Sequence, residues 1–123
     1  MNHKENFVEF LRNSTFNGDI VWAITKAQSP ISQYITNPDF ISQIFHANVK
    51  ENDIYFVIHK YIKYVPELDQ YYEQFEKFLL VLDGNYLVYS VFESEVSEDM
   101  LNILAEEIRG KQESAFFDSF MQN

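Results

Sequence analysis

The chain has 123 residues, 46% hydrophobic and 17% aromatic, which is enough apolar surface for one core, so we expect a single folded domain over residues 1–123. Nineteen acidic against nine basic residues give a net charge of −10, which opposes direct binding to the phosphate backbone of nucleic acids. The chain has no cysteine, which excludes disulfides, thiolate nucleophiles and cysteine-based zinc sites.

The cellular compartment is predicted from the apolar runs and the missing cysteines. Charged residues interrupt the apolar residues between Phe7 and Arg12, which is not the pattern of a secretory signal. The longest apolar stretch, from Phe78 to Leu82, is five residues long, whereas a membrane span needs roughly 20. We therefore expect a cytoplasmic protein with no membrane partner.

The first forty-five residues contain signals for two helices and a strand. Apolar residues at helical spacing from Phe7 to Leu11 predict a short helix that ends near Asn13. The unbroken β-branched and aromatic run after the turn at Gly18 predicts a central strand over residues 19–25. An N-cap and proline signal at residues 37–39, followed by apolar residues at helical spacing from Phe40 to Phe45, predicts a second helix of about two turns.

The middle of the chain changes to a period of two. Residues 53–65 alternate between two sets of apolar side chains, which predicts a long strand. Pro66 and apolar residues at helical spacing up to Leu79 predict a third helix, whose end is ambiguous because residues 77–82 also fit a strand. With the turn residues Asp83, Gly84 and Asn85 and a second strand over residues 86–93, we favour a hairpin there.

The C-terminal part is predicted to be helical. Ser97 is a suitable N-cap, and Gly110 is suitable as the residue after the last turn, which predicts a fourth helix over residues 98–109. The tail contains Phe116, Phe117 and Phe120, so we expect a last helix docked on the body or on a partner.

These elements predict an α+β fold. The sheet is expected to be antiparallel with about four strands, over residues 19–25, 53–65, 77–82 and 86–93. The helices are expected to cover mainly one face of this sheet.

The charge is divided unevenly along the chain. Residues 1–65 contain six acidic and six basic residues, whereas residues 66–123 contain thirteen acidic and three basic ones. The net charge of −10 therefore lies in the second half. A solvated face is the simpler interpretation, and a surface that meets a basic protein is the other.

Two groups of acidic residues define the candidate binding surface. On the predicted third helix the spacing places three acids on one stripe, and a second group precedes the fourth helix. Tyr72 and Tyr89 are candidate anchors, since tyrosine is enriched at interface hot spots, although ordinary packing also explains them. The candidate partner-binding residues are Asp69, Tyr72, Glu73, Glu76, Tyr89, Glu93, Glu95, Glu98 and Asp99.

No motif in the chain indicates an enzyme. His3, His46 and His59 are far apart in the sequence, and the three glycines are isolated, so neither a metal-ligand pair nor a phosphate-binding loop is present. We predict no catalytic residues, no metal and no cofactor. A histidine beside a carboxylate in a titratable cleft would be needed to favour an enzyme.

In size, acidity, absence of cysteine and absence of catalytic motifs, the chain resembles the small cytoplasmic immunity proteins of bacterial toxin systems, such as those of contact-dependent growth inhibition. This resemblance implies stoichiometric binding of a basic, nuclease-type toxin and occlusion of its active site by the acidic surface. A phage-encoded inhibitor that mimics nucleic acid fits the same profile. The alternative is an acidic secretion chaperone that holds an effector segment and usually dimerises. The sequence leaves the oligomeric state and the partner's identity open.

Overall fold

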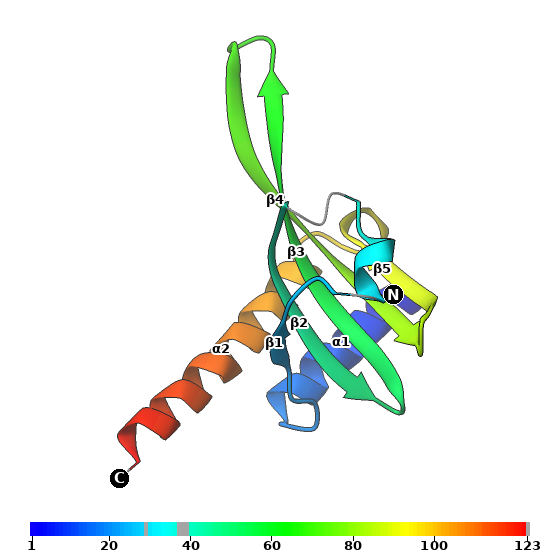
Figure 1. Ribbon diagram of the computed structural model, residues 1–123, viewed down its shortest axis with the longest axis vertical. Helices are drawn as coiled ribbons and strands as arrows, with labels where there is room; N and C mark the ends of the chain where they lie inside the picture. Colours follow the sequence, from blue (N-terminus) through cyan, green and yellow to red (C-terminus); the bar gives the residue numbers. More distant parts are fainter. Residues whose placement is uncertain (29, 37–39, 123) are drawn as a thin grey trace. The chain divides into compact units, whose positions relative to one another are not determined.

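A computed structural model describes residues 1–28, 30–36 and 40–122, which divide into two compact units. One unit contains Met1–Trp22 and the chain from Glu93 onward, and the other contains Ala23–Phe92. The described residues have an α+β fold with two helices and a five-stranded antiparallel sheet in the order β1-β2-β3-β4-β5 (Figure 1). The fold class is confirmed, with one strand more than predicted.

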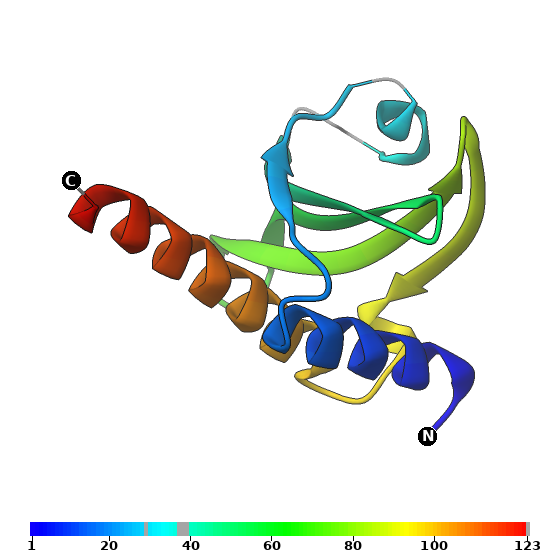
Figure 2. The same ribbon diagram turned by 90° about the horizontal axis from the view of Figure 1, so that it is seen from below.

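The helical unit consists of α1 (His3–Phe16), the short 3₁₀ turn η3 (Glu93–Glu95) and α2 (Met100–Met121). A capping box starts α1, since Asn2 Oδ1 accepts from the Glu5 backbone N–H and the Glu5 carboxylate accepts from the Asn2 backbone N–H. Figure 2 shows α1 beside the first half of α2, with the second half continuing past it. The buried apolar residues of the two helices are Val8, Leu11, Leu101, Leu104, Ala105 and Ile108.

The sheet unit contains the strands β1 to β5 and the 3₁₀ turn η1. Their bounds are β1 (Ala23–Thr25), η1 (Ile31–Tyr34), β2 (Ile41–Val49), β3 (Asn52–Val65), β4 (Gln70–Asp83) and β5 (Tyr86–Phe92). Its main buried cluster joins η1 to one face of β2, β3 and β4, and consists of Ile31, Ile35, Ile44, Val57, Phe78, Leu80 and Leu82. Figure 2 shows η1 lying over this side of the sheet.

Three predicted elements are confirmed with small changes of boundary. The strand predicted over residues 53–65 is β3, and the strand predicted over residues 86–93 is β5. The hairpin turn between β4 and β5 is also as predicted. Gly84 in this turn has a φ of 62°, a backbone conformation that glycine adopts more easily than residues with a Cβ. The first helix is longer than predicted and runs to Phe16.

The helix predicted over residues 37–45 is wrong where the structure describes it. Residues 37–39 lie outside the described residues, and Ile41–Val49 form β2. Ile44 and Phe45 are both buried although neighbouring residues of a strand point to opposite faces, so β2 is covered on both faces here. A strand buried on both faces has consecutive apolar residues, which here coincide with helical spacing.

The helix predicted from Pro66 is also wrong, because this segment forms β4. Residues 66–69 make a tight turn in which the Leu68 N–H donates to the Val65 carbonyl, and Asp69 has a φ of 49°. Thirteen residue pairs then align β3 with β4 without a register shift, from Asp53 opposite Leu82 to Val65 opposite Gln70. Pairing with a long alternating strand outweighs a local helical spacing of apolar residues.

Two further boundaries are corrected. The strand predicted over residues 19–25 was expected to be central, but its paired part is Ala23–Thr25, and β1 is an edge strand that pairs with β2. The helix predicted over residues 98–109 is α2, which continues through Gly110 to Met121 and includes the predicted last helix. Its N-cap residue is Asp99 rather than Ser97.

Candidate functional site

Part of the predicted acidic surface lies on the outer half of the β3–β4 hairpin. β2 pairs with β3 only as far as Ile41 opposite His59, and β5 pairs with β4 only from Phe78 onward. Residues 60–77, which we call the distal arm, therefore form a two-stranded ribbon that extends past the neighbouring strands (Figure 1).

The predicted stripe of Asp69, Glu73 and Glu76 does not exist. Residues three apart on a strand point to opposite faces, so Glu73 and Glu76 are on different sides of the arm. Glu73 forms an ion pair with Lys60, with 2.8 Å between Oε1 and Nζ. Glu76 Oε1 lies 3.7 Å from His59 Nδ1. These contacts divide the predicted stripe into separate cross-strand pairs.

Asp69 and Tyr72 also make local contacts on the arm. The Tyr64 hydroxyl donates to Asp69 Oδ1 at 2.6 Å, and this hydrogen bond raises the pKa of the Tyr64 phenol. The Tyr72 hydroxyl donates to Gln70 Oε1 at 2.6 Å. Tyr89, the other candidate anchor, is half-buried on β5 opposite Val81. It is therefore a less accessible anchor than the tyrosines of the arm.

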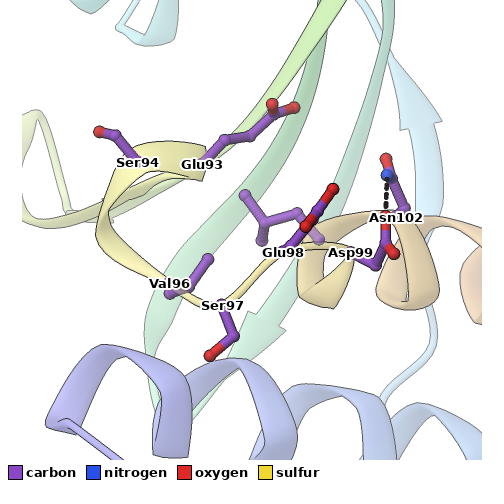
Figure 3. A pocket seen from close by; sticks show the side chains of 8 residues that line it. Glu93, Ser94, Val96, Ser97, Glu98, Asp99 and Asn102 are labelled. Atoms are coloured by element: carbon purple, nitrogen blue, oxygen red, sulfur yellow. Dashed lines mark hydrogen bonds between the residues drawn. The ribbon is translucent and has the colours of Figure 1, made fainter.

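The second acidic group lies in the helical unit, where β5 has ended and α2 begins. A pocket of about 430 Å³ is lined there by Glu93, Ser94, Val96, Ser97, Glu98, Asp99, Leu101 and Asn102. Figure 3 shows these side chains around the bend of the chain between η3 and α2, with Asn102 donating to Asp99 Oδ1. Asp99 has a φ of 70°, which turns the backbone into the helix. Three of the eight lining residues are carboxylates and none is basic.

This bend is held in place from α1. The Glu5 carboxylate accepts from the Ser97 backbone N–H at 2.9 Å and from the Ser97 hydroxyl. These hydrogen bonds, with that from Asn2, lower the pKa of Glu5. Glu95 forms an ion pair with Lys4. Ser97 therefore connects two segments, a role different from the predicted N-cap.

The electrostatics of the two groups differ. Residues 93–107 contain six acidic and no basic residues, namely Glu93, Glu95, Glu98, Asp99, Glu106 and Glu107. The distal arm contains three lysines (Lys60, Lys63 and Lys77) and four acidic residues (Glu67, Asp69, Glu73 and Glu76). The segment 93–107 is thus the stronger candidate for contact with a basic protein.

One histidine lies beside a carboxylate on the sheet. His46 Nε2 is 2.8 Å from Asp53 Oδ1, and Asn48 donates to the same oxygen. The His46 and Tyr55 rings lie 4.8 Å apart, centroid to centroid. The hydrogen bond from His46 lowers the pKa of Asp53. The sequence placed His46 directly after a predicted helix rather than on a strand, so it offered no reason to pair it with Asp53.

Sequence reasoning also missed the exposed apolar side chains of the arm. Ile62, Tyr64, Tyr71 and Phe75 lie on one face, because Tyr64 is paired with Tyr71 and the others follow at even spacing along each strand. The alternation within residues 53–65 was visible, but its partner strand was assigned to a helix. Correct assignment of β4 would have revealed this face.

Comparisons with known proteins do not identify the chain: no family model matches it, and no curated protein or solved structure is significantly similar. Within the described ranges, no helix is long and apolar enough to cross a membrane. The described residues also contain no group of three or more metal-ligating side chains.

Proposed function

We propose that this chain is a protein-binding inhibitor that recognises a basic domain through residues 93–99. The observation that carries the proposal is the pocket between η3 and α2, which has Glu93, Glu98 and Asp99 in its wall and no basic residue. A lysine or arginine side chain entering this pocket would meet several carboxylates at once.

The class of target follows from the same charges. Nuclease active sites hold phosphates with lysine and arginine side chains, so a cluster of carboxylates complements such a groove. Complementary fields also accelerate association. On this basis we propose an immunity protein that neutralises a nuclease-type bacterial toxin by covering its active site. The proposal assigns the chain a binding role in the cytoplasm and no enzymatic one.

The distal arm contributes less to this interaction in our proposal. Glu73 and Glu76 face Lys60 and His59, which reduces the charge that they present to a partner. Asp69 and Tyr72 are engaged by hydrogen bonds within the arm. They remain candidates for the edge of an interface, where charges contribute little to affinity.

The test is a pull-down with the tagged protein from its source cell, at low salt and at about 0.5 M salt, where screening weakens exposed charge pairs. The proposal expects one basic toxin or nuclease domain, retained at low salt and reduced at high salt. The retained protein is then purified, and its cleavage of nucleic acid is measured with increasing amounts of this chain. Inhibition should be complete at a one-to-one ratio.

Matched charge reversals locate the surface. Glu93→Lys with Glu98→Lys should weaken binding at least about tenfold, whereas Glu73→Lys with Glu76→Lys changes the net charge equally and should have a smaller effect. Circular dichroism verifies that each variant is folded. Equal losses from the two pairs, or a retained partner that is not basic, would refute the role of residues 93–99.

The alternative of a secretion chaperone is supported by one observation. The last turns of α2 expose Phe116, Phe117, Phe120 and Met121, with exposed fractions between 59% and 74%. Such a surface suits an apolar effector segment. The two proposals are distinguished by Phe117→Ser with Phe120→Ser, which should abolish binding of an effector segment and leave toxin inhibition unchanged.

A further inference from the structure

The distal arm has an exposed apolar face. Ile62, Tyr64, Tyr71 and Phe75 on this face have exposed fractions between 44% and 73%. A two-stranded ribbon is marginally stable in water, whereas three or more strands with an apolar face are stable together. The arm is therefore a surface that an added strand would stabilise.

The β3 side of the arm is an open edge. Among the described residues, 60–65 pair with β4 on one side, while β2 ends at Ile41 on the other. Figure 1 shows this part of β3 and β4 alone beyond the rest of the sheet. Unpaired backbone N–H and C=O groups at such an edge accept another strand.

The base and the tip of this edge both expose apolar side chains. At the base, a pocket of about 310 Å³ is lined by Phe40, His59, Lys60, Tyr61 and Ile62. At the tip, the turn of residues 66–69 exposes Leu68, and Glu67 precedes it. A second arm that runs antiparallel to the first places its tip next to this base, so the exposed apolar side chains of both ends lie close to the interface.

The charge balance of the arm also permits pairing between two copies at this edge. The arm has three lysines and four acidic residues, so two arms repel each other little, although the whole chain has a net charge of −10. An antiparallel register with Ile62 opposite Ile62 puts Lys60 opposite Tyr64 and Tyr61 opposite Lys63. Lys60 and Lys63 then each face an aromatic ring, and the apolar faces of both arms lie on the same side.

We propose that the distal arm binds a second copy of this chain. Residues 60–64 of one copy pair with residues 60–64 of the other about a two-fold axis at Ile62, which makes a four-stranded β4-β3-β3-β4 ribbon that ends where His59 pairs with Ile41 of β2. Each contact occurs twice because the interface is isologous. The interface is independent of residues 93–99, so it goes beyond the proposed inhibitor function and can fail without it.

Sedimentation velocity tests the association. In physiological salt, between about 10 µM and about 1 mM, the range in which small interfaces associate, the protein should change reversibly from monomer to dimer. Ile62→Lys should weaken dimerisation at least about tenfold, since two lysines then meet at the axis. The exposed Ile62 is paired with Glu73, which accommodates a lysine in the monomer.

The matched control is Val88→Lys, which changes an exposed β-branched residue on β5, an edge strand of the sheet, and should leave dimerisation unchanged. A monomer at every concentration would overturn the proposal. Equal effects of the two lysine variants would also overturn it.

The register is tested by cross-linking, since the chain has no cysteine of its own. Directly opposite residues on antiparallel strands have the spacing that a disulfide requires, so Ile62→Cys should form covalent dimers under mild oxidation. Val88→Cys should remain mostly monomeric. Similar yields from both variants would show that β3 does not pair at Ile62.

Discussion

The carboxylate of Glu5, in the first turn of α1, accepts two hydrogen bonds from Ser97, which is 92 positions later in the chain. The same carboxylate caps its own helix through the Asn2 backbone N–H. One side chain thus fixes the start of α1 and the bend that carries Glu98 and Asp99. The wall of the acidic pocket therefore depends on a residue that does not line it.

Glu5→Gln should destabilise the protein in a pH-dependent way. The pKa of Glu5 is lowered below its ordinary value of 4.5 by the hydrogen bonds from Ser97 and Asn2. Its contribution to stability is therefore fully present above pH 4.5 and is lost as the pH falls through the lowered folded-state pKa. The free energy of unfolding of the parent protein and of Glu5→Gln is measured with urea between neutral pH and about pH 3. A difference in unfolding free energy between the two proteins that stays constant with pH would contradict the prediction.

The turn between β2 and β3 can be improved. Lys50 and Glu51 have φ angles of 51° and 69°, and positive φ at both central residues is the condition of a type I′ turn, which prefers Asn-Gly. Lys50→Asn with Glu51→Gly should raise the free energy of unfolding by about 1 kcal/mol. Denaturant unfolding measures this, and a loss of stability would show that the two side chains contribute more than their backbone strain costs.

Two glycines should respond in opposite directions to alanine. A Cβ would meet nothing within 4 Å at either Gly84 or Gly110, so packing does not decide the outcome. Gly110 lies inside α2, and Gly110→Ala should stabilise the protein by up to about 1 kcal/mol. Gly84 has a φ of 62°, and Gly84→Ala should destabilise it by about 1 kcal/mol. The midpoint of thermal unfolding is compared between each variant and the parent protein. Midpoint shifts of the same sign for Gly110→Ala and Gly84→Ala would refute the conformational explanation.

Tyr64 should ionise at a higher pH than an ordinary tyrosine. Its hydroxyl donates to Asp69, and ionisation breaks that hydrogen bond, which raises the pKa of the phenol. Nuclear magnetic resonance of the labelled tyrosine rings follows each titration. Asp69→Ala should return the pKa of Tyr64 to the ordinary range of tyrosine. An unchanged titration of Tyr64 in Asp69→Ala would contradict this cause.

Several features of the protein are determined by the sequence alone. The apolar side chains of residues 53–65 alternate with a period of two, which fits a strand and not a helix, and β3 forms where it was predicted. The turn residues before Tyr86 fixed the β4–β5 hairpin, and the apolar face of residues 101–108 fixed the helix that buries it. The concentration of acidic residues after Pro66 is likewise a property of the sequence.

Tertiary structure decided the elements whose apolar spacing fits both a helix and a strand. In residues 40–45 and 66–79 the local signal favoured a helix, but residues 41–45 and 70–79 pair with β3, a long partner strand that satisfies their backbone groups. That choice also divided the predicted acidic surface. On a helix Glu73 and Glu76 would share a face, whereas on β4 they point to opposite faces, and the group at residues 93–99 lines a pocket. Pairing with another strand sets the direction in which each side chain points. This pairing is not encoded in the apolar spacing of one segment.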